Sequence, residues 1–226
     1  MTANEPLAGQ SLADAVVGRL RTAISTGRYP PGERLVERRL AHEFGISHIP
    51  LREALARLTE EGLVERLPRR GARVASLTPR MLEEVSSLRV VLEQFVVRRL
   101  AGRFTPEARD GLQAIIGQMM LAAGQHDLLA LHELDQKFHQ RLWELTDNSL
   151  LVELSAQMRT RTSHFYLAAA TSLAPNELRM HARSHQHLLD IIASGDQRAA
   201  EQAMQQHIED AARRISKAQQ DQKETA

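Results

Sequence analysis

The chain has 226 residues, 25% of them charged, and a formal net charge of +1, which suits one large or two small globular domains. No apolar run reaches membrane-spanning length and no basic segment precedes an apolar one near the start, so we expect a cytoplasmic protein without a membrane partner. The absence of cysteine excludes disulfides and thiolate sites, so any metal site must use nitrogen and oxygen ligands.

Charge is unevenly divided along the chain. Residues 1–76 hold twelve arginines, no lysine and nine acids, a net of +3, whereas residues 77–226 hold 17 Lys+Arg and 19 Asp+Glu. Arginine suits bidentate contacts with phosphate and guanine better than lysine does. The asymmetry is mild, and alone it carries little weight as a sign of nucleic-acid binding.

The first third predicts three helices. Residues 11–27 place apolar side chains at four-residue spacing and end at a glycine, as a helix does. The segment YPPGERL predicts a turn without regular structure, because it holds two prolines and a glycine. Shorter helices are expected at 36–45 and 46–62, with the four-residue turn GISH between them.

A hairpin is expected next. Two segments that alternate apolar and polar residues flank the turn PRRG, which predicts two strands with arginines at the tip. Helix, helix, short turn, helix and hairpin is the order of a winged helix-turn-helix. We assign residues 10–76 to this DNA-binding domain, after an expected flexible tail at 1–9.

The remainder is helical almost throughout. Short polar breaks such as GQHD and TDNS are typical of connections between antiparallel helices. The expected helices are 79–102, 106–124, 126–146, 148–170, 175–193 and 196–219. The fold class is therefore mainly α, with a helical domain at 79–219 and a frayed tail at 220–226.

The third helix is the candidate DNA-reading element. Polar side chains at the N-terminal end of such a helix reach base edges, and its exposed amides favour phosphate. Residues at that end are Ser47, His48, Ile49 and Arg52. Candidates for backbone or minor-groove contacts are Arg38, Arg39, Arg69, Arg70 and Arg73. Singly, each arginine is better explained as solvated surface, but their gathering on one such module favours DNA contact.

This region resembles the DNA-binding domain of the GntR family of bacterial transcription regulators. The matching elements are the G-x-x-x-P-G-x-x-L turn, LA-x-x-F-G-I-S, P-L-R-E-A-L-x-x-L, EGLV and RRGARV. By position, the resemblance implies DNA contacts from Arg38, Ser47, His48, Ile49, Arg52, Arg70 and Gly71. Family members usually have Ser-Arg-Thr-Pro where this chain has Ser-His-Ile-Pro at 47–50, which implies an altered operator or weaker binding.

The histidines of the helical part have informative spacing. Asp135 and His139 lie one turn apart on one helix and point the same way. His185 and His207 flank the break at Gly195, ten and twelve residues away, so they lie at nearly equal height on facing helices. A carboxylate and three imidazoles would form a site for Zn²⁺, Ni²⁺, Mn²⁺ or Fe²⁺.

Plainer explanations exist for these residues. An isolated Asp/His pair one turn apart is usually a surface hydrogen bond, and His187 could replace His185 as a ligand. Ordinary structural roles are expected for His126, His132, His164 and His181, although His181 also lies one helical turn from His185.

The helical part resembles the effector domain of the FadR/FCD branch of the GntR family. The similar segments are SLRVVLEQFVVRRLA, DQKFH, DNSLL, HQHLLDIIASGD and AMQQHI, within residues 79–215. The resemblance implies a divalent transition metal bound by Asp135, His139, His185 and His207. It also implies a small carboxylic acid as effector, which Arg89 would help to bind; an ion pair with Glu93 is the alternative role of Arg89.

These features predict a ligand-responsive repressor and not an enzyme. The expected partners are a small organic or sugar acid, a second copy of the chain and double-stranded DNA with a palindromic operator. A constitutive DNA-binding regulator with a purely structural metal is the main alternative. A metal-dependent hydrolase is remote, because Gln136 stands where the H-E-x-x-H motif needs its second histidine.

Overall fold

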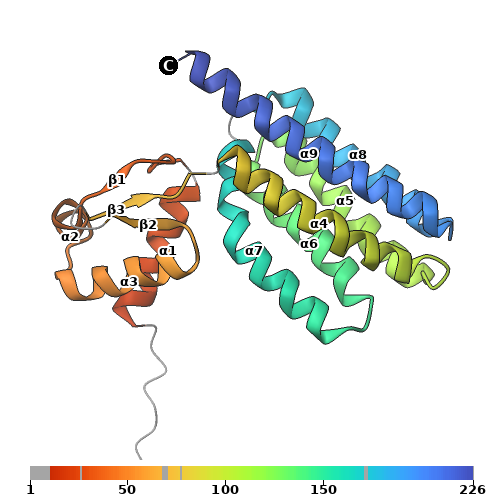
Figure 1. Ribbon diagram of the computed structural model, residues 1–226, viewed down its shortest axis with the longest axis horizontal. Helices are drawn as coiled ribbons and strands as arrows, with labels where there is room; N and C mark the ends of the chain where they lie inside the picture. The colour runs from red at the N-terminus through yellow and green to blue at the C-terminus, as the bar shows by residue number, and fades with distance from the viewer. Residues whose placement is uncertain (1–10, 26, 68–70, 77, 171–172, 226) are drawn as a thin grey trace, which may run out of the picture. The chain divides into compact units, whose positions relative to one another are not determined.

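The chain forms two compact units, Met1–Ser76 and Leu77–Ala226, in a computed structural model (Figure 1). Residues described are 11–25, 27–67, 71–76, 78–170 and 173–225. Within these, the side chains are described except at 25, 160–165, 167–170, 218–219 and 221–225. The expected tail at 1–9 therefore lies outside the described residues.

The first unit packs three helices against a small sheet. The elements are α1 (Leu12–Ser25), β1 (Arg34–Leu35), α2 (Glu37–Phe44), α3 (His48–Glu60), β2 (Val64–Leu67) and β3 (Gly71–Val74). The strands are antiparallel in the order β1-β3-β2. Leucines at apolar helix positions fill the core; the fully buried ones include Leu20, Leu35, Leu40, Leu51, Leu55 and Leu58. This arrangement confirms the predicted winged helix-turn-helix.

The segment YPPGERL was predicted wrongly at its end, because Arg34 and Leu35 form a third strand. Leu35 pairs with Ala72, and the Val74 amide donates to the Glu33 carbonyl at 2.8 Å. The side chain of Leu35 is completely buried. A strand of two residues is too short to show the alternation on which strand prediction depends.

The turn between α2 and α3 depends on Gly45. This residue adopts φ 65° and ψ 37°, the left-handed conformation that ends a helix and that glycine adopts without steric cost. Its amide donates to the His42 carbonyl at 3.2 Å, and the next amide, that of Ile46, donates to the Ala41 carbonyl at 3.0 Å. The tight turn lets α3 begin at His48.

The second unit is the predicted bundle of helices. They are α4 (Pro79–Leu100), α5 (Pro106–Gln125), α6 (Leu128–Glu144), α7 (Ser149–Ala170), α8 (Pro175–Ala193) and α9 (Gln197–Thr225). Figure 1 shows α4 running beside α9, with α8 behind α9. The last helix continues beyond its predicted end at 219, so the expected frayed tail is helical as far as Thr225.

The core of this unit is continuous across the helices. Its fully buried large side chains include Leu112, Met119, Phe138, Leu142, Leu188 and Leu189. Of the described helices, none has the length and apolar character needed to cross a lipid bilayer.

Core packing on α5 gives the first prediction. Leu112 is completely buried, whereas Leu121 on the same helix is 67% exposed. We expect Leu112→Ala to lower the free energy of unfolding by about 2–5 kcal/mol, because it leaves a cavity. Leu121→Ala should change it by less than about 0.5 kcal/mol. Urea unfolding followed by circular dichroism measures both, and equal effects would contradict this packing.

Candidate functional site

The N-terminal end of α3 presents polar groups to solvent. Ser47 occupies the N-cap position with extended backbone, and its hydroxyl makes no capping hydrogen bond. The side chains of Ser47 and His48 are exposed, and Ile49 is 71% exposed. An uncapped helix end leaves amide donors for a phosphate, and the exposed side chains can approach base edges.

The predicted contact arginines have different surroundings. Arg52 donates from Nε to Glu37 on α2 at 2.7 Å, but this pair is exposed and costs little to separate. Arg38 is exposed, and no carboxylate of the described residues forms an ion pair with it. Arg39 and Arg73, the other two candidates within the described residues, are paired with glutamates. Among the described candidate arginines, Arg38 is therefore the most available to a phosphate.

The second strand of the wing, β3, begins at Gly71. This residue has φ 89°, a conformation that other residues adopt only with strain, and an added Cβ would lie 3.7 Å from the Leu35 carbonyl oxygen. The predicted contacts Arg69 and Arg70 precede it at the hairpin tip, but both lie outside the described residues. For Gly71, the backbone conformation supplies a structural reason for glycine that is independent of DNA.

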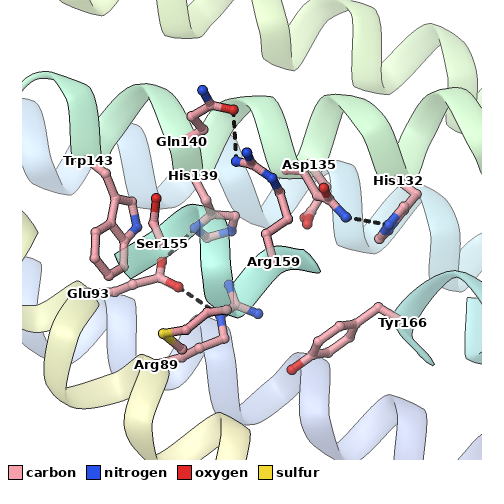
Figure 2. Close-up of a pocket in the computed structure, with 12 residues that line it drawn as sticks. Arg89, Glu93, His132, Asp135, His139, Gln140, Trp143, Ser155, Arg159 and Tyr166 are labelled. Carbon is pink, nitrogen blue, oxygen red and sulfur yellow. Dashed lines mark hydrogen bonds and ion pairs between the residues drawn. The ribbon is translucent and has the colours of Figure 1, made fainter. Parts of the chain in front are cut away.

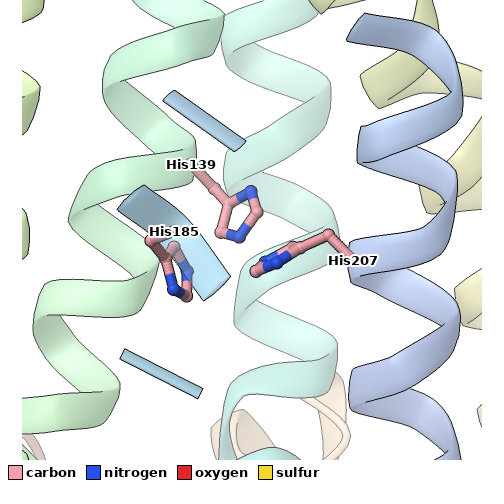
Figure 3. Close-up of side chains that lie close together, drawn as sticks. All are labelled: His139, His185 and His207. Carbon is pink, nitrogen blue, oxygen red and sulfur yellow. The ribbon is translucent and has the colours of Figure 1, made fainter. Parts of the chain in front are cut away.

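Three histidines from different helices meet inside the second unit (Figure 3). His139 on α6, His185 on α8 and His207 on α9 are all buried, and each offers a ligand atom within 4.8 Å of the others. The ring centroids of His185 and His207 are 4.5 Å apart, as the spacing around the Gly195 turn predicts. His187, the alternative to His185, is exposed.

Hydrogen bonds fix the protonation of these rings. His139 Nδ1 donates to Glu93 Oε2 at 2.6 Å, and His185 Nδ1 donates to the His181 carbonyl at 2.9 Å. The Ser184 hydroxyl donates to that same carbonyl at 2.7 Å, so it accepts from His207 Nδ1 at 3.2 Å. A neutral imidazole carries one proton, so the neutral rings of His185 and His207 keep the lone pair of Nε2 free.

The free nitrogen of His185 is the clearest sign that these residues fit a metal. His185 Nε2 is buried and has no hydrogen-bond partner within the described part of the chain. It lies 3.0 Å from Asp135 Oδ1, but the geometry is not that of a hydrogen bond. A buried lone pair beside a carboxylate and two other imidazoles suits a divalent cation with nitrogen and oxygen ligands.

Asp135 makes a contact that the sequence analysis missed. Its Oδ1 accepts a hydrogen bond from His181 Nε2 at 2.9 Å, and Arg214 donates to His181 Nδ1 at 3.4 Å. His181 was expected to have only an ordinary structural role, yet with Asp135 and His185 it forms a second possible ligand group. Its four-residue spacing from His185 was the available signal. In this tautomer, His181 orients Asp135 rather than offering a lone pair.

The ionisation of the site favours a bound cation. Burial lowers the pKa of His185 to about 4 and holds that of His207 well below 6.5, so both rings are neutral at pH 7. Burial by itself would raise the pKa of Asp135, but the hydrogen bond from His181 holds it well below 3.8. The result is an anionic carboxylate among neutral imidazoles, which is the ligand state that a metal requires.

Glu93 is a second buried anion behind the ligands. Burial opposes its ionisation, but Arg89 and His139 outweigh that effect and lower its pKa to about 2. Arg89 Nε donates to Glu93 Oε1 at 2.8 Å, so the ion pair expected as the alternative role of Arg89 is present. Arg89, Glu93 and His139 thus form a chain that leads to the cluster. A carboxylate bonded to Nδ1 makes the opposite ring nitrogen a better ligand.

Two small cavities of about 80 Å³ and 70 Å³ adjoin the cluster (Figure 2 shows the first). Lining residues common to both are Arg89, His132, Asp135, His139 and Tyr166. Arg89 therefore combines its ion pair with a position on the cavity wall. Together the cavities offer room for a small polar ligand beside the candidate metal ligands.

Glu93 provides a test of the metal-binding chemistry. We expect Glu93→Gln to lower the affinity for Zn²⁺ by about 10- to 100-fold, because the hydrogen bond to His139 loses its charge. Competition with a chromophoric chelator measures the affinity. Glu83→Gln, on the exposed side of α4, serves as the control and should bind as wild type does. An unchanged affinity in Glu93→Gln would show that Glu93 does not support the ligands.

Comparison with known protein families covers both units. The FCD domain family matches residues 84–210, and the family of bacterial regulatory proteins called gntR matches residues 12–74. The HTH-type transcriptional repressor RspR of Escherichia coli K12 is 28% identical over 180 residues, 80% of this chain and 78% of that protein. The gluconate operon transcriptional repressor of Bacillus licheniformis is 31% identical over 152 residues, 67% of this chain and 62% of that protein.

A solved structure agrees in fold. Escherichia coli McbR/YncC superposes with a TM-score of 0.72 at 24% identity, over 92% of this chain and 98% of that one. This likeness bears on the fold alone. The family matches go further, because together they span the helix-turn-helix and most of the helical unit. The chain therefore belongs to the GntR family of bacterial transcription regulators, with an FCD domain as its second unit, and it is a DNA-binding transcriptional regulator.

Proposed function

We propose that this regulator is a cytoplasmic homodimeric repressor that binds a divalent transition metal and a small carboxylic acid. The observation that carries the proposal is the cluster of His139, His185 and His207, in which every Nδ1 is hydrogen-bonded and the buried Nε2 of His185 has no hydrogen-bond partner among the described residues. Asp135 supplies the carboxylate ligand. When bound, the metal supplies a Lewis-acidic centre with open positions for an acid.

Arg89 is the protein group that receives the acid. Only its Nε is used by Glu93, and its guanidinium carbon lies 5.7 Å from the centroid of the Tyr166 ring. The guanidinium therefore stays fixed while its other N–H groups remain for a carboxylate. Organic acids and sugar acids both fit this description, and the name of the gluconate operon repressor associates one relative with a sugar acid.

A bound acid would act by changing the packing of the bundle. The ligands and cavity walls come from α4, α6, α7, α8 and α9, so a molecule held between them favours one packing of these helices over another. Such a population shift changes DNA affinity only if the acid binds the two packings unequally. The names of RspR and the gluconate operon protein support repression as the regulatory outcome.

DNA contact is assigned to the N-terminal end of α3 and to the wing. The proposed residues are Arg38, Ser47, His48, Ile49, Arg52, Arg70 and Gly71. The proposal places paired copies of α3 in successive major grooves of a palindromic operator. The exposed Ile49 would contact an apolar group such as a thymine methyl, in place of the threonine usual in the family.

The DNA proposal predicts the effects of two substitutions on α3. With an operator selected from random duplexes, we expect Arg52→Ala to weaken specific binding by about 1–3 kcal/mol. Arg57→Ala, in the last turn of the same helix, should leave it unchanged. Fluorescence anisotropy at fixed salt measures both. Equal losses in the two variants would mean that the N-terminal end of α3 is not the reading surface.

Acid-dependent release from DNA tests the regulatory proposal. We expect a panel of small organic and sugar acids to include one that weakens operator binding by the metal-loaded protein. Arg89→Gln should require a higher concentration of that acid, because it loses a charged hydrogen-bond donor. If the metal-loaded protein binds its operator equally with and without every acid, the constitutive regulator with a structural metal is the better account.

A further inference from the structure

A second arginine of the first cavity has no acidic partner among the described residues. Arg159 on α7 is half-buried and lines the cavity beside Asp135 and His139. Its Nη1 donates to Gln140 Oε1 at 2.8 Å, and no carboxylate of the described residues forms an ion pair with it. A partly buried guanidinium that is held by a neutral amide has unused donors and an unneutralised charge.

Arg89 and Arg159 reach the first cavity from different helices. Arg89 comes from α4 and lies beside Glu93 and Tyr166, whereas Arg159 comes from α7 and extends toward Gln140 on α6 (Figure 2). Two such groups can hold two separate anionic groups of one ligand. The Gln140 contact fixes the guanidinium of Arg159 in place, which lowers the entropy lost when a ligand binds.

The arginines of the cavity wall favour an anionic ligand. Arg89 and Arg159 both line the cavity, and Arg214 lies on the wall of the adjoining cavity. Arg89 is paired with Glu93, whereas no carboxylate of the described residues forms an ion pair with Arg159. One anionic group bound by Arg89 and the metal therefore leaves Arg159 available for a second anionic group.

The size of the cavity suits a short ligand. A volume of about 80 Å³ holds on the order of five to eight water-sized groups. A four- or five-carbon diacid has about this size, particularly if one carboxylate extends toward the adjoining cavity.

We propose that Arg159 binds the second anionic group of the effector, so that the effector is a small dicarboxylate. This inference rests on the proposed effector site, in which the metal and Arg89 receive the first carboxylate. Arg159 then determines specificity, because it distinguishes a dianion from a monoanion of the same shape. A neutral second group would leave its guanidinium unpaired.

The test compares diacids with isosteric monoamides. Full-length protein loaded with one equivalent of Zn²⁺ is titrated in a calorimeter with succinate, glutarate, succinamate and glutaramate. We expect wild type to bind at least one diacid about 10- to 100-fold more tightly than its monoamide, as the loss of a charged hydrogen bond implies. Arg159→Gln should bind both at the monoamide level, and Arg159→Lys should keep part of the preference.

A control variant separates Arg159 from general changes in charge. Arg141→Gln removes an exposed arginine of α6 that pairs with Glu144, and it should keep the full preference for the diacid. Metal content measured on every variant shows that the zinc site is intact. A preference retained by Arg159→Gln would overturn the inference.

Two further outcomes distinguish this inference from the proposed function. Equal binding of a diacid and its monoamide by wild type would overturn the role of Arg159 and leave the effector site standing. An equal loss of affinity for both ligands in Arg159→Gln would do the same, since Arg159 would then not sense the second charge. No binding of any of the four compounds by zinc-loaded wild type would overturn the inference, and the wider panel of organic and sugar acids would then decide whether the proposed effector site stands.

Discussion

The helical unit must bury several ionisable side chains at the point where its helices meet. Isolated buried charges and unpaired polar groups are costly, and this cluster is organised to avoid most of that cost. Glu93 is neutralised by Arg89 and His139, and burial keeps His185 and His207 uncharged. Among the described residues of the cluster, His185 Nε2 is left buried without a hydrogen-bond partner. The interaction of this nitrogen with a cation is the physical requirement on which the proposed effector chemistry depends.

Two local features of the fold bring the residues of this cluster together. Asp135 and His139 share one face of α6, and the tight turn at Gly195 sets α8 against α9 so that His185 and His207 face each other. The partners at Nδ1 come from α4 and from α8 itself, which fixes the rings before any ligand arrives. Preorganised ligands of this kind lose little entropy on binding, so the bundle is a scaffold for the site.

Periodicity and spacing predict much of this molecule, and the reasons are local. Apolar residues at helical intervals predict the helices from α4 through α9. The GISH turn with its glycine predicts the helix-turn-helix. The third strand was not predicted because it has only two residues. The roles of His181 and Arg159 were not predicted because they depend on neighbours from other helices, Asp135 and Gln140, which spacing along one helix does not reveal. Pairing between helices requires the three-dimensional structure.

The most direct test of the account is the metal content of protein purified without a histidine tag or chelator. Elemental analysis of wild type, His185→Ala and Asp135→Ala would be compared with His187→Ala, whose side chain is exposed. The account predicts about one transition metal per chain in wild type and His187→Ala, and a loss in the other two variants. Metal-free wild type, even after reconstitution, would contradict it and leave the histidines as the polar lining of a metal-free pocket.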